Sequence, residues 1–425
     1  MDTFVYKDHK KLRCGYTTGT CAALAAQGAV RFLLTGSWKE TEEIMTPKGV
    51  PVCVSLEEKT SGDSWAECAV RKDAGDDYDV TNGILVYARA EFVKDKNFYE
   101  KVQMSHLESS GFGAAGEKPG LSPENQKQQK KANAAHQKEA LPESLVRIDG
   151  GIGIGRITKS GLDQPVGAAA INSVPRKMIR DAVYELLEEA GELRLVSITI
   201  SVPAGVEAAK KTFNPVLGIE GGISVLGTSG IVEPMSEEAL VETIRTHLNV
   251  LKAEGRKWVI AVPGNMGAGF LERYLVEHGK FCTDAHQGSN AADTDAAVEA
   301  EQMAYGELST GTEPSLLEGF MNSLVTMSNF VGKTIDLAAE LGFSGILIAG
   351  HMGKLVKIGN GIMNTHSREA DGRMDTMLSC ALSAGTEDLE LLRKIQRSNT
   401  TDEAMDHLKQ AGIIEDTINV FLKRA

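Results

Sequence analysis

A glycine-rich stretch in the middle of the chain has the residue types and spacing to lie against a small molecule. Residues 149–176 read DGGIGIGRITKSGLDQPVGAAAINSVPR. The pattern D-x-G-x-G-x-G within it is formed by Asp149, Gly151, Gly153 and Gly155. Glycine has no Cβ, so such a segment lets the backbone approach a ligand closely. A glycine-rich β-turn followed by an extended segment explains the same pattern equally well.

The residues directly after the glycines narrow the kind of cofactor. Many S-adenosylmethionine-dependent methyltransferases use this spacing, whereas a dinucleotide fingerprint requires a helix to begin within the motif. Residues 156–167, RITKSGLDQPVG, come next, and their proline and glycines argue against a helix before Asn172. The sequence therefore favours S-adenosylmethionine over a nicotinamide cofactor. We predict that substituting Gly153 by valine abolishes catalysis and leaves the protein folded.

A second glycine-rich stretch, GHMGKLVKIGNGIMNTHS at residues 350–367, concentrates basic side chains. It is not a P-loop, because Ile348 and Leu355 occupy positions where that motif needs glycine and serine or threonine. The basic side chains of this loop and its end are His351, Lys354, Lys357, His366 and Arg368. Such a set suits carboxylates or phosphates, although a solvated turn with surface lysines is the alternative.

Two N-terminal motifs carry polar groups. GYTTGT, residues 15–20, places hydroxyls and backbone N–H groups at a predicted helix start, which favours an anion or simple capping. Its candidate ligand-binding residues are Thr18, Gly19 and Thr20. KDAGDDYDVTNG, residues 72–83, holds four aspartates without EF-hand spacing. Turns stabilised by aspartate side chains explain that motif better than a cation site.

Composition limits the function classes. The 425 residues carry a formal net charge of −13, which argues against non-specific nucleic-acid binding. Six scattered cysteines without a C-x-x-C pair argue against a structural zinc site or a disulfide framework. No apolar run approaches a membrane span, and no signal peptide is recognised. We therefore expect a cytoplasmic protein that binds no membrane.

The surrounding elements place these motifs. Apolar spacing predicts a helix from about Thr20 to Thr35 that ends at Gly36, then three strand-like segments before residue 93. A second helix follows Pro175, capped by Asn172 or Ser173 and ended by Gly191. Later strands and helices alternate, which is typical of a parallel sheet, and the C-terminus from about Ser367 is mostly helical. In such sheets ligands bind where strands end, and PGNMGAG (263–269) and GHMGKL (350–355) each follow a predicted strand.

Composition also suggests the domain boundaries. Residues 103–145 are polar and lack apolar periodicity, which predicts a disordered insert. We expect an α+β domain at 1–235 that contains this insert. We expect an α/β layered domain with a mostly parallel sheet and a helical C-terminus at 236–425.

Together the motifs resemble one family. GYTTGTCAALAA, KDAGDDYDVTNG, GGIGIGRITKSGL, VGAAAINSVPRKMI, KKTFNPVLGIEGGISVLGTSGIVEPMSEEAL, SNFVG and GHMGKLVKIGNGIMNTHS occur in the order of the CbiD family. The resemblance implies an S-adenosylmethionine-dependent C-methyltransferase that converts cobalt-precorrin-5B to cobalt-precorrin-6A by methylating C-1 in anaerobic cobalamin biosynthesis. It also implies that the first domain is similar to the second domain of ribosomal protein S5. Cobalt would arrive with the substrate, so no protein-bound metal is expected, and a homo-oligomer is left open.

The tetrapyrrole substrate of that family carries many carboxylates, which basic side chains bind. The residues that we expect to bind it are Arg156, Lys159, Arg176, Lys354, Lys357 and Arg368. His351 or His366 could move a proton or face the cobalt. Two other functions stay open from the residues alone: a nicotinamide-dependent oxidoreductase, and a corrinoid-binding protein of the same pathway without enzymatic activity.

Overall fold

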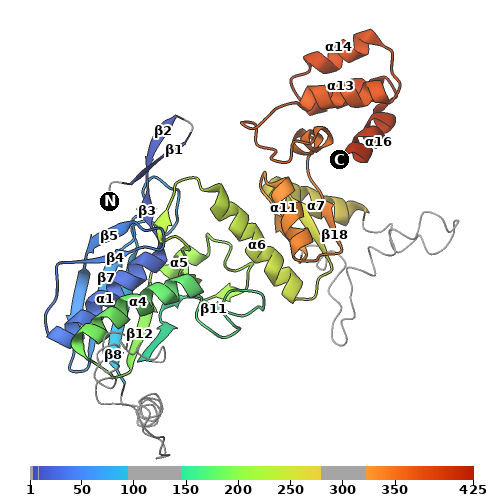
Figure 1. Ribbon diagram of the computed structural model, residues 1–425. Helices are drawn as coiled ribbons and strands as arrows, with labels where there is room; N and C mark the ends of the chain where they lie inside the picture. Colours follow the sequence, from blue (N-terminus) through green and yellow to red (C-terminus); the bar gives the residue numbers. More distant parts are fainter. Residues whose placement is uncertain (1–2, 8, 94–144, 279–321) are drawn as a thin grey trace, which may run out of the picture. The chain divides into compact units, whose positions relative to one another are not determined.

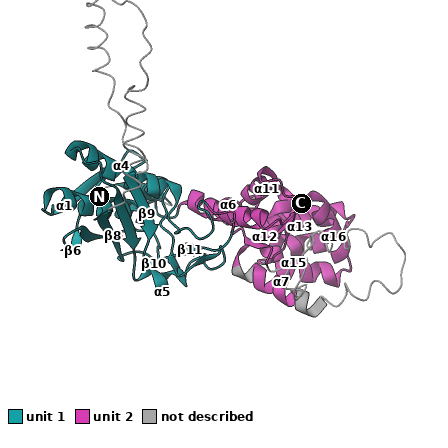
Figure 2. Ribbon diagram, turned by 90° about the horizontal axis from the view of Figure 1, so that it is seen from below, with its two compact units in different colours: residues 1–159, 163–235 teal, residues 160–162, 236–425 magenta. Residues whose placement is uncertain are grey.

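The structure is a computed structural model that describes residues 3–7, 9–93, 145–278 and 322–425 (Figure 1). Its residues form two compact units (Figure 2). Unit 1 comprises residues 1–159 and 163–235, and unit 2 comprises residues 160–162 and 236–425. The fold is mixed α/β, in agreement with the sequence. Nearly all of the predicted insert at 103–145 falls outside the described residues.

A five-stranded sheet forms the centre of unit 1. Its order is β6 (Glu57–Ser61), β7 (Trp65–Arg71), β8 (Leu85–Phe92), β12 (Val196–Ser201) and β9 (Val146–Gly150). The pairs β6–β7, β7–β8 and β8–β12 are antiparallel, and β12–β9 is parallel. Burial alternates along β12, where Val196, Ile198 and Ile200 are fully buried. One face of the sheet therefore belongs to the core.

Two helices pack against each other in unit 1, and α1 (Thr18–Thr35) also packs on β7 and β8 (Figure 1). The second helix is α4 (Ser173–Ala190). Every residue of α1 from Thr18 to Val30 is buried, because small side chains allow close approach on all sides. The thiols of Cys14, Cys21 and Cys68 lie in this core, and Cys68 donates a hydrogen bond to the Ala25 carbonyl (3.2 Å).

The predicted ends of both helices are confirmed. Thr17 caps α1 by accepting the N–H of Thr20, and Gly36 ends it in the left-handed conformation. Asn172 occupies the N-cap position of α4, and Gly191 ends that helix with a φ of 62°. These ends were predictable because capping residues and glycine act locally.

Short elements complete unit 1. The antiparallel pairs are β1 (Phe4–Lys7) with β2 (Lys10–Arg13), β3 (Gly15–Tyr16) with β15 (Ile231–Val232), β4 (Thr41–Met45) with β5 (Pro51–Ser55), and β11 (Arg156–Ile157) with β13 (Ile219–Glu220). A parallel pair joins β10 (Gly153–Ile154) and β14 (Gly222–Ile223), beside the short helix α5 (Gly205–Ala209). The glycine-rich stretch thus forms three short strands, β9 to β11.

Unit 2 contains a parallel sheet of order β17 (Leu324–Thr326), β16 (Trp258–Val262) and β18 (Gly345–Ile348). Its neighbours in the fold are α6 (Glu237–Ala253), α7 (Gly264–His278) and α11 (Val331–Glu340). The parallel arrangement predicted from alternating strands and helices is confirmed. The strand predicted before GHMGKL is β18. From its apolar residues, FSGILIAGHMG at 343–353, we expected a buried strand, but β18 lies at the edge of the described sheet and Leu347 is 48% exposed.

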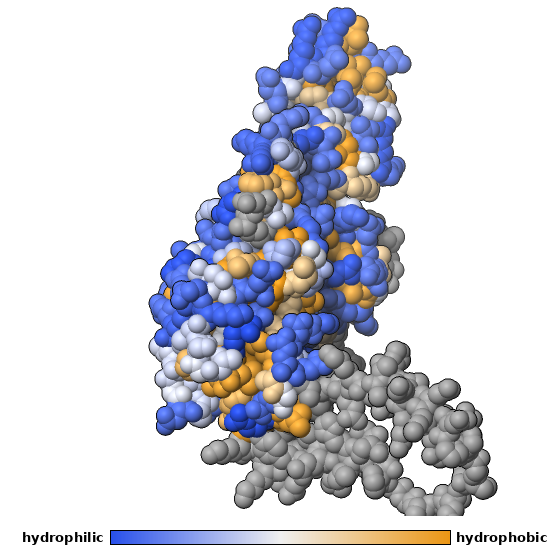
Figure 3. Space-filling view, turned by 60° about the vertical axis from the view of Figure 1, so that its left-hand side comes forward, coloured by the Kyte–Doolittle hydropathy of each residue, from blue (hydrophilic) through white to orange (hydrophobic). Residues whose placement is uncertain are grey.

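Helices make up the C-terminal part of unit 2, as predicted. They are α12 (Met352–Leu355), the 3₁₀ helix η3 (Val356–Asn360), α13 (Arg373–Ser383), α14 (Leu389–Arg397), α15 (Thr401–Gln410) and α16 (Ile414–Arg424). Their shared core includes Val356, Met377, Ile395 and Leu408. On the face drawn in Figure 3, hydrophobic residues lie in small groups among hydrophilic ones. Within the described chain, no helix combines the length and the apolarity that membrane crossing requires.

Candidate functional site

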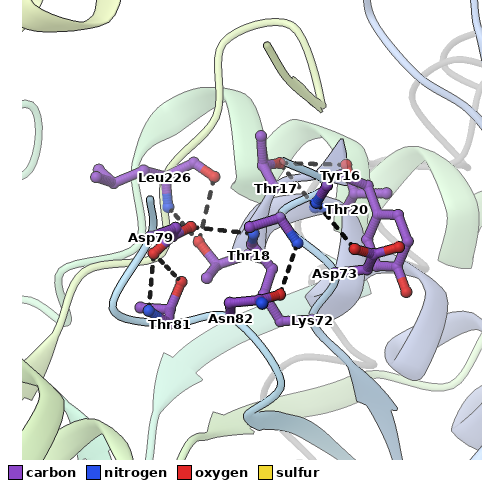
Figure 4. Close-up of polar contacts among 12 residues, drawn as sticks. Tyr16, Thr17, Thr18, Thr20, Lys72, Asp73, Asp79, Thr81, Asn82 and Leu226 are labelled. Carbon is purple, nitrogen blue, oxygen red and sulfur yellow. Dashed lines mark hydrogen bonds and ion pairs between the residues drawn. The ribbon is translucent and has the colours of Figure 1, made fainter. Parts of the chain in front are cut away.

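The motifs GYTTGT and KDAGDDYDVTNG meet at the beginning of α1 (Figure 4). Thr18 Oγ1 accepts the N–H of Leu226 (3.0 Å), and the Gly19 N–H donates to the Leu226 carbonyl (3.0 Å). Thr20 Oγ1 donates to the Gly230 carbonyl (2.6 Å). Thr18, Gly19 and Thr20 are thus buried and already have partners within the chain. The sequence left anion binding and helix capping open for GYTTGT. The structure shows capping, in which Thr17 accepts the N–H of Thr20.

Lys72, the first residue of KDAGDDYDVTNG, forms a buried ion pair that was not predicted from the sequence. Its side chain is 1% exposed, and its Nζ lies 3.1 Å from Asp79 Oδ2. Burial alone would raise the pKa of Asp79, but the positive charge of Lys72 and the hydrogen bonds from Thr81 hold it below its ordinary value. A lysine directly after a buried strand, followed by four aspartates, was the signal that could have revealed this ion pair.

The remaining aspartates hold the same loop in place. Asp73 accepts two hydrogen bonds from the Arg13 guanidinium (2.5 and 2.8 Å), and this contact lowers the pKa of Asp73. Asp76 accepts the N–H of Arg13, and Asp77 accepts the N–H of Met235 (2.9 Å). Within the loop, Asp73 accepts the N–H of Gly75 (2.8 Å) and Asp79 accepts the N–H of Thr81 (2.7 Å), so the predicted turns stabilised by aspartate side chains are confirmed. The described residues contain no cluster of three metal-binding side chains.

The glycines of the D-x-G-x-G-x-G pattern approach the chain itself. A Cβ on Gly151 would meet the Ser201 side chain, and one on Gly153, whose φ is +75°, would overlap the Val202 carbonyl. A Cβ on Gly155 would meet Ile219 and the backbone of β14. Packing within the fold accounts for the absence of side chains at these three glycines. The β-turn and extended-segment interpretation describes what the structure shows.

Asp149 pairs with Arg156 beside these glycines. Arg156 donates to both carboxylate oxygens of Asp149 (2.7 and 3.2 Å) and to the Gly150 carbonyl (2.7 Å). Burial alone would raise the pKa of Asp149, but the hydrogen bonds from Arg156 and the Gly150 N–H hold it below its ordinary value. About half of each side chain is exposed. Both groups remain accessible to a ligand.

Two other predicted substrate-binding residues in unit 1 have structural contacts. Arg176 donates to the carbonyls of Ile148 (2.9 Å) and Ile171 (2.8 Å), and burial lowers the pKa of its guanidinium. It therefore links α4 to β9. The Lys159 stem lies where a Cβ on Gly218 would be placed.

The loops that follow the three parallel strands of unit 2 converge at the carboxyl edge of the sheet. A Cβ on Gly350, after β18, would lie 2.7 Å from the Pro263 side chain, after β16. Lys354 donates to Oδ1 of Asn329, after β17, at 2.9 Å. The predicted convergence of PGNMGAG and GHMGKL is thus confirmed. We call Asn329, Lys354 and the neighbouring Thr365, which donates its N–H to the Asn329 carbonyl (2.9 Å), the carboxyl-edge cluster.

The two histidines of this loop differ in which ring nitrogens already contact the chain. His351 Nδ1 accepts the N–H of Gly353 (3.0 Å), and its Nε2 lies 3.5 Å from Asp402. Both ring nitrogens of His351 therefore face groups of the chain. His366 Nδ1 accepts the N–H of Arg368 (3.2 Å), which places the proton of the neutral ring on Nε2. His366 can then donate to a ligand from Nε2.

The basic side chains of this loop also differ in their exposure to solvent. Lys357 is 3% exposed, and its ammonium donates to the carbonyls of Thr365 (3.2 Å) and Ala370 (2.7 Å). Lys354 and Arg368 are exposed. Lys354 therefore suits a solvent-borne anion, whereas Lys357 holds the loop together.

Comparison with known proteins gives one consistent result. The CbiD family model matches residues 5–129 and 126–234, and the model of the CbiD C-terminal domain matches residues 364–425. A relative from Thermoanaerobacter sp. (strain X514), named cobalt-precorrin-5B C(1)-methyltransferase, is 36% identical over 97% of this chain and 87% of its own length. A relative of the same name from Methanocaldococcus jannaschii is 34% identical over 99% of this chain and 90% of its own.

One solved structure also matches. It is the crystal structure of the cobalamin biosynthesis protein (cbiD) from Archaeoglobus fulgidus, which is 22% identical to this chain. The match covers 87% of both chains with a TM-score of 0.36.

Proposed function

Because this chain belongs to the CbiD family, we propose that it is the methyltransferase that methylates C-1 of cobalt-precorrin-5B in cobalamin biosynthesis. The observation that carries the proposal is identity of 34–37% over nearly the full length with relatives of that name. S-adenosylmethionine is the methyl donor that such a reaction implies. The product is then cobalt-precorrin-6A.

The chemistry places modest demands on the protein. The S–CH₃ bond of the sulfonium breaks and its electron pair stays on sulfur, while C-1 of the ring supplies the pair for the new C–C bond. The sulfonium is already activated, so the protein contributes alignment of the two carbons and exclusion of water. No protein nucleophile takes part in this step.

Within unit 2, we propose that the carboxyl-edge cluster binds a carboxylate of the tetrapyrrole through Lys354. This edge is where ligands bind in parallel α/β sheets, and Lys354 is exposed there. His366 adds a hydrogen-bond donor at Nε2, and Arg368 a further positive charge on the same loop. Lys357 and His351 support the loop, because their polar atoms face the chain.

Within unit 1, we propose that Arg156 binds a substrate carboxylate, because its guanidinium is half exposed. Thr18, Gly19 and Thr20 are excluded from donor binding in this proposal by their internal hydrogen bonds. We also assign no donor contact to the glycines of the D-x-G-x-G-x-G pattern, because the chain fills the Cβ positions of Gly151, Gly153 and Gly155. Arg176 is assigned to folding.

The test is methyl transfer by the purified full-length chain. Cobalt-precorrin-5B and methyl-labelled S-adenosylmethionine should give one labelled methyl group on the ring and one equivalent of S-adenosylhomocysteine. Failure to transfer the label would overturn the proposal. Calorimetric titration separates the two alternatives: a corrinoid-binding protein without activity would bind the ring but not S-adenosylmethionine, and an oxidoreductase would bind a nicotinamide cofactor.

A further inference from the structure

We propose that Asn329 is a positioning residue that holds the Lys354 ammonium ready for a substrate carboxylate while leaving its charge unneutralised. The inference deepens the proposed function and rests on it. Nothing in the sequence linked these two residues, which lie 25 positions apart. The contact between them is a single hydrogen bond of 2.9 Å from Lys354 Nζ to Asn329 Oδ1.

Backbone contacts hold Asn329, and with it the base of its side chain, in place. Asn329 follows Ser328, whose φ of +53° is a left-handed conformation that side chains other than glycine rarely adopt. The Asn329 carbonyl accepts the N–H of Thr365 (2.9 Å), and an isolated bridge joins Phe330 to Asn364. The loop after β17 is thus joined to residues 364–365 at two consecutive positions, so the side-chain oxygen has a defined place.

The chemistry of the acceptor matters as much as its position. An amide oxygen orients the ammonium with one hydrogen bond, and an ammonium has three donors, so two remain for a ligand. A carboxylate at this position would orient Lys354 equally well but would cancel its charge. Elsewhere in this chain exposed lysines meet carboxylates, as Lys177 does with Asp181 and Lys210 with Glu207. The choice of asparagine therefore preserves a positive charge at the edge where the three loops converge.

Asn329→Asp separates this role from a structural one. The change adds no atoms and keeps an oxygen acceptor for Lys354, so a purely structural role predicts unchanged kinetics. If Lys354 binds a substrate carboxylate, the new charge competes for it. We then expect KM for cobalt-precorrin-5B to rise about ten- to a hundredfold, the loss typical of one charge-assisted hydrogen bond. KM for S-adenosylmethionine should stay within about twofold.

Two controls make the result specific. Gln396→Glu introduces the same amide-to-carboxylate change at an exposed position of α14 and should leave both KM values unchanged. In Lys354→Ala, which raises KM for the tetrapyrrole by itself, adding Asn329→Asp should give no further rise, because the two residues act as one unit. Circular dichroism and thermal midpoints of all variants should match those of the wild type within a few degrees.

The outcomes distinguish the inference from the function it rests on. If the wild type transfers methyl groups but Asn329→Asp leaves KM for the tetrapyrrole unchanged, the role of Asn329 is overturned and the proposed function stands. If the wild type transfers none, the proposed function falls. The same comparison made by calorimetric titration with cobalt-precorrin-5B then still decides the role of Asn329, because equal Kd values for wild type and variant would refute it.

Discussion

Replacing Lys72 by methionine should destabilise unit 1 strongly. The substitution keeps the volume of the side chain but leaves the Asp79 carboxylate, 23% exposed, without its cation. Removing one partner of a buried ion pair typically costs about 3–5 kcal/mol. Asp79 keeps two hydrogen bonds from Thr81, so we expect the lower end, about 3 kcal/mol. For a unit of this size that is a fall in Tm of roughly 6–12 °C.

The effect of pH on this variant has a definite sign. The folded-state pKa of Asp79 in the wild type lies below its unfolded value, so the pair contributes fully above about pH 4. That contribution is lost as the pH falls through the folded-state pKa. In Lys72→Met, burial acts on Asp79 without the lysine, so its pKa should rise above the unfolded value. The deficit of the variant should then be largest near pH 7 and shrink as the pH falls toward 5.

The assay is urea unfolding followed by fluorescence in a Trp258→Phe background. Trp38 and Trp65 lie in unit 1 and Trp258 lies in unit 2, so the remaining signal reports on unit 1. The double variant Lys72→Met/Asp79→Asn should recover most of the loss, because it removes the unpaired charge. A deficit below about 1 kcal/mol, or one that does not depend on pH between 8 and 5, would refute the reasoning.

Three further predictions test contacts described above. Gly153→Ala should lower the unfolding midpoint of unit 1, because φ is positive and the Val202 carbonyl fills the space, whereas Gly167→Ala, also at positive φ but in open space, should cost less; equal midpoints would contradict this. His351→Ala should reduce the stability of unit 2 by about 0.5–2 kcal/mol through loss of the α12 cap while kcat falls less than tenfold, as thermal melts and steady-state kinetics would show. Asp149→Asn should change unfolding free energy by less than about 1 kcal/mol in urea titrations, because its pair with a guanidinium is half exposed; a larger loss would show a buried role.

The structure changes the prediction that Gly153→Val leaves the protein folded. The sequence suggested a folded protein without activity, since a glycine beside a ligand tolerates no side chain. The structure places that Cβ position against the Val202 carbonyl, so valine would disturb folding itself. Lost activity in such a variant would therefore say nothing about cofactor binding.

Local signals were readable in the sequence because they act within a few residues. Thr17 and Gly36 mark the ends of α1, and the alternation of strands and helices indicated the parallel strands of unit 2. The spacing of aspartates likewise indicated turns. The placement of loops 263–269 and 350–355 at one sheet edge followed from parallel topology alone.

Long-range contacts were not readable in that way. The partners of Arg176 and Lys357 are backbone carbonyls, which any sequence supplies, so nothing in the side chains revealed that these cations serve folding. The glycines at 151–155 suggested ligand contact, because a sequence cannot tell whether the missing Cβ makes room for a ligand or for another strand. Asn329 escaped notice for the same reason, since its partner is fixed only by the fold.

The packing of α1 also determines the reactivity of its neighbours toward alkylating reagents. Burial raises the pKa of Cys21 and of Cys68 to about 12, so both remain neutral thiols at physiological pH and are shielded from attack. Cys53, by contrast, is exposed on β5. Maleimide should modify Cys53 quickly and the two core thiols only when the helix separates from the sheet. The rate at which maleimide modifies the two core thiols then reports on how often the helix separates from the sheet.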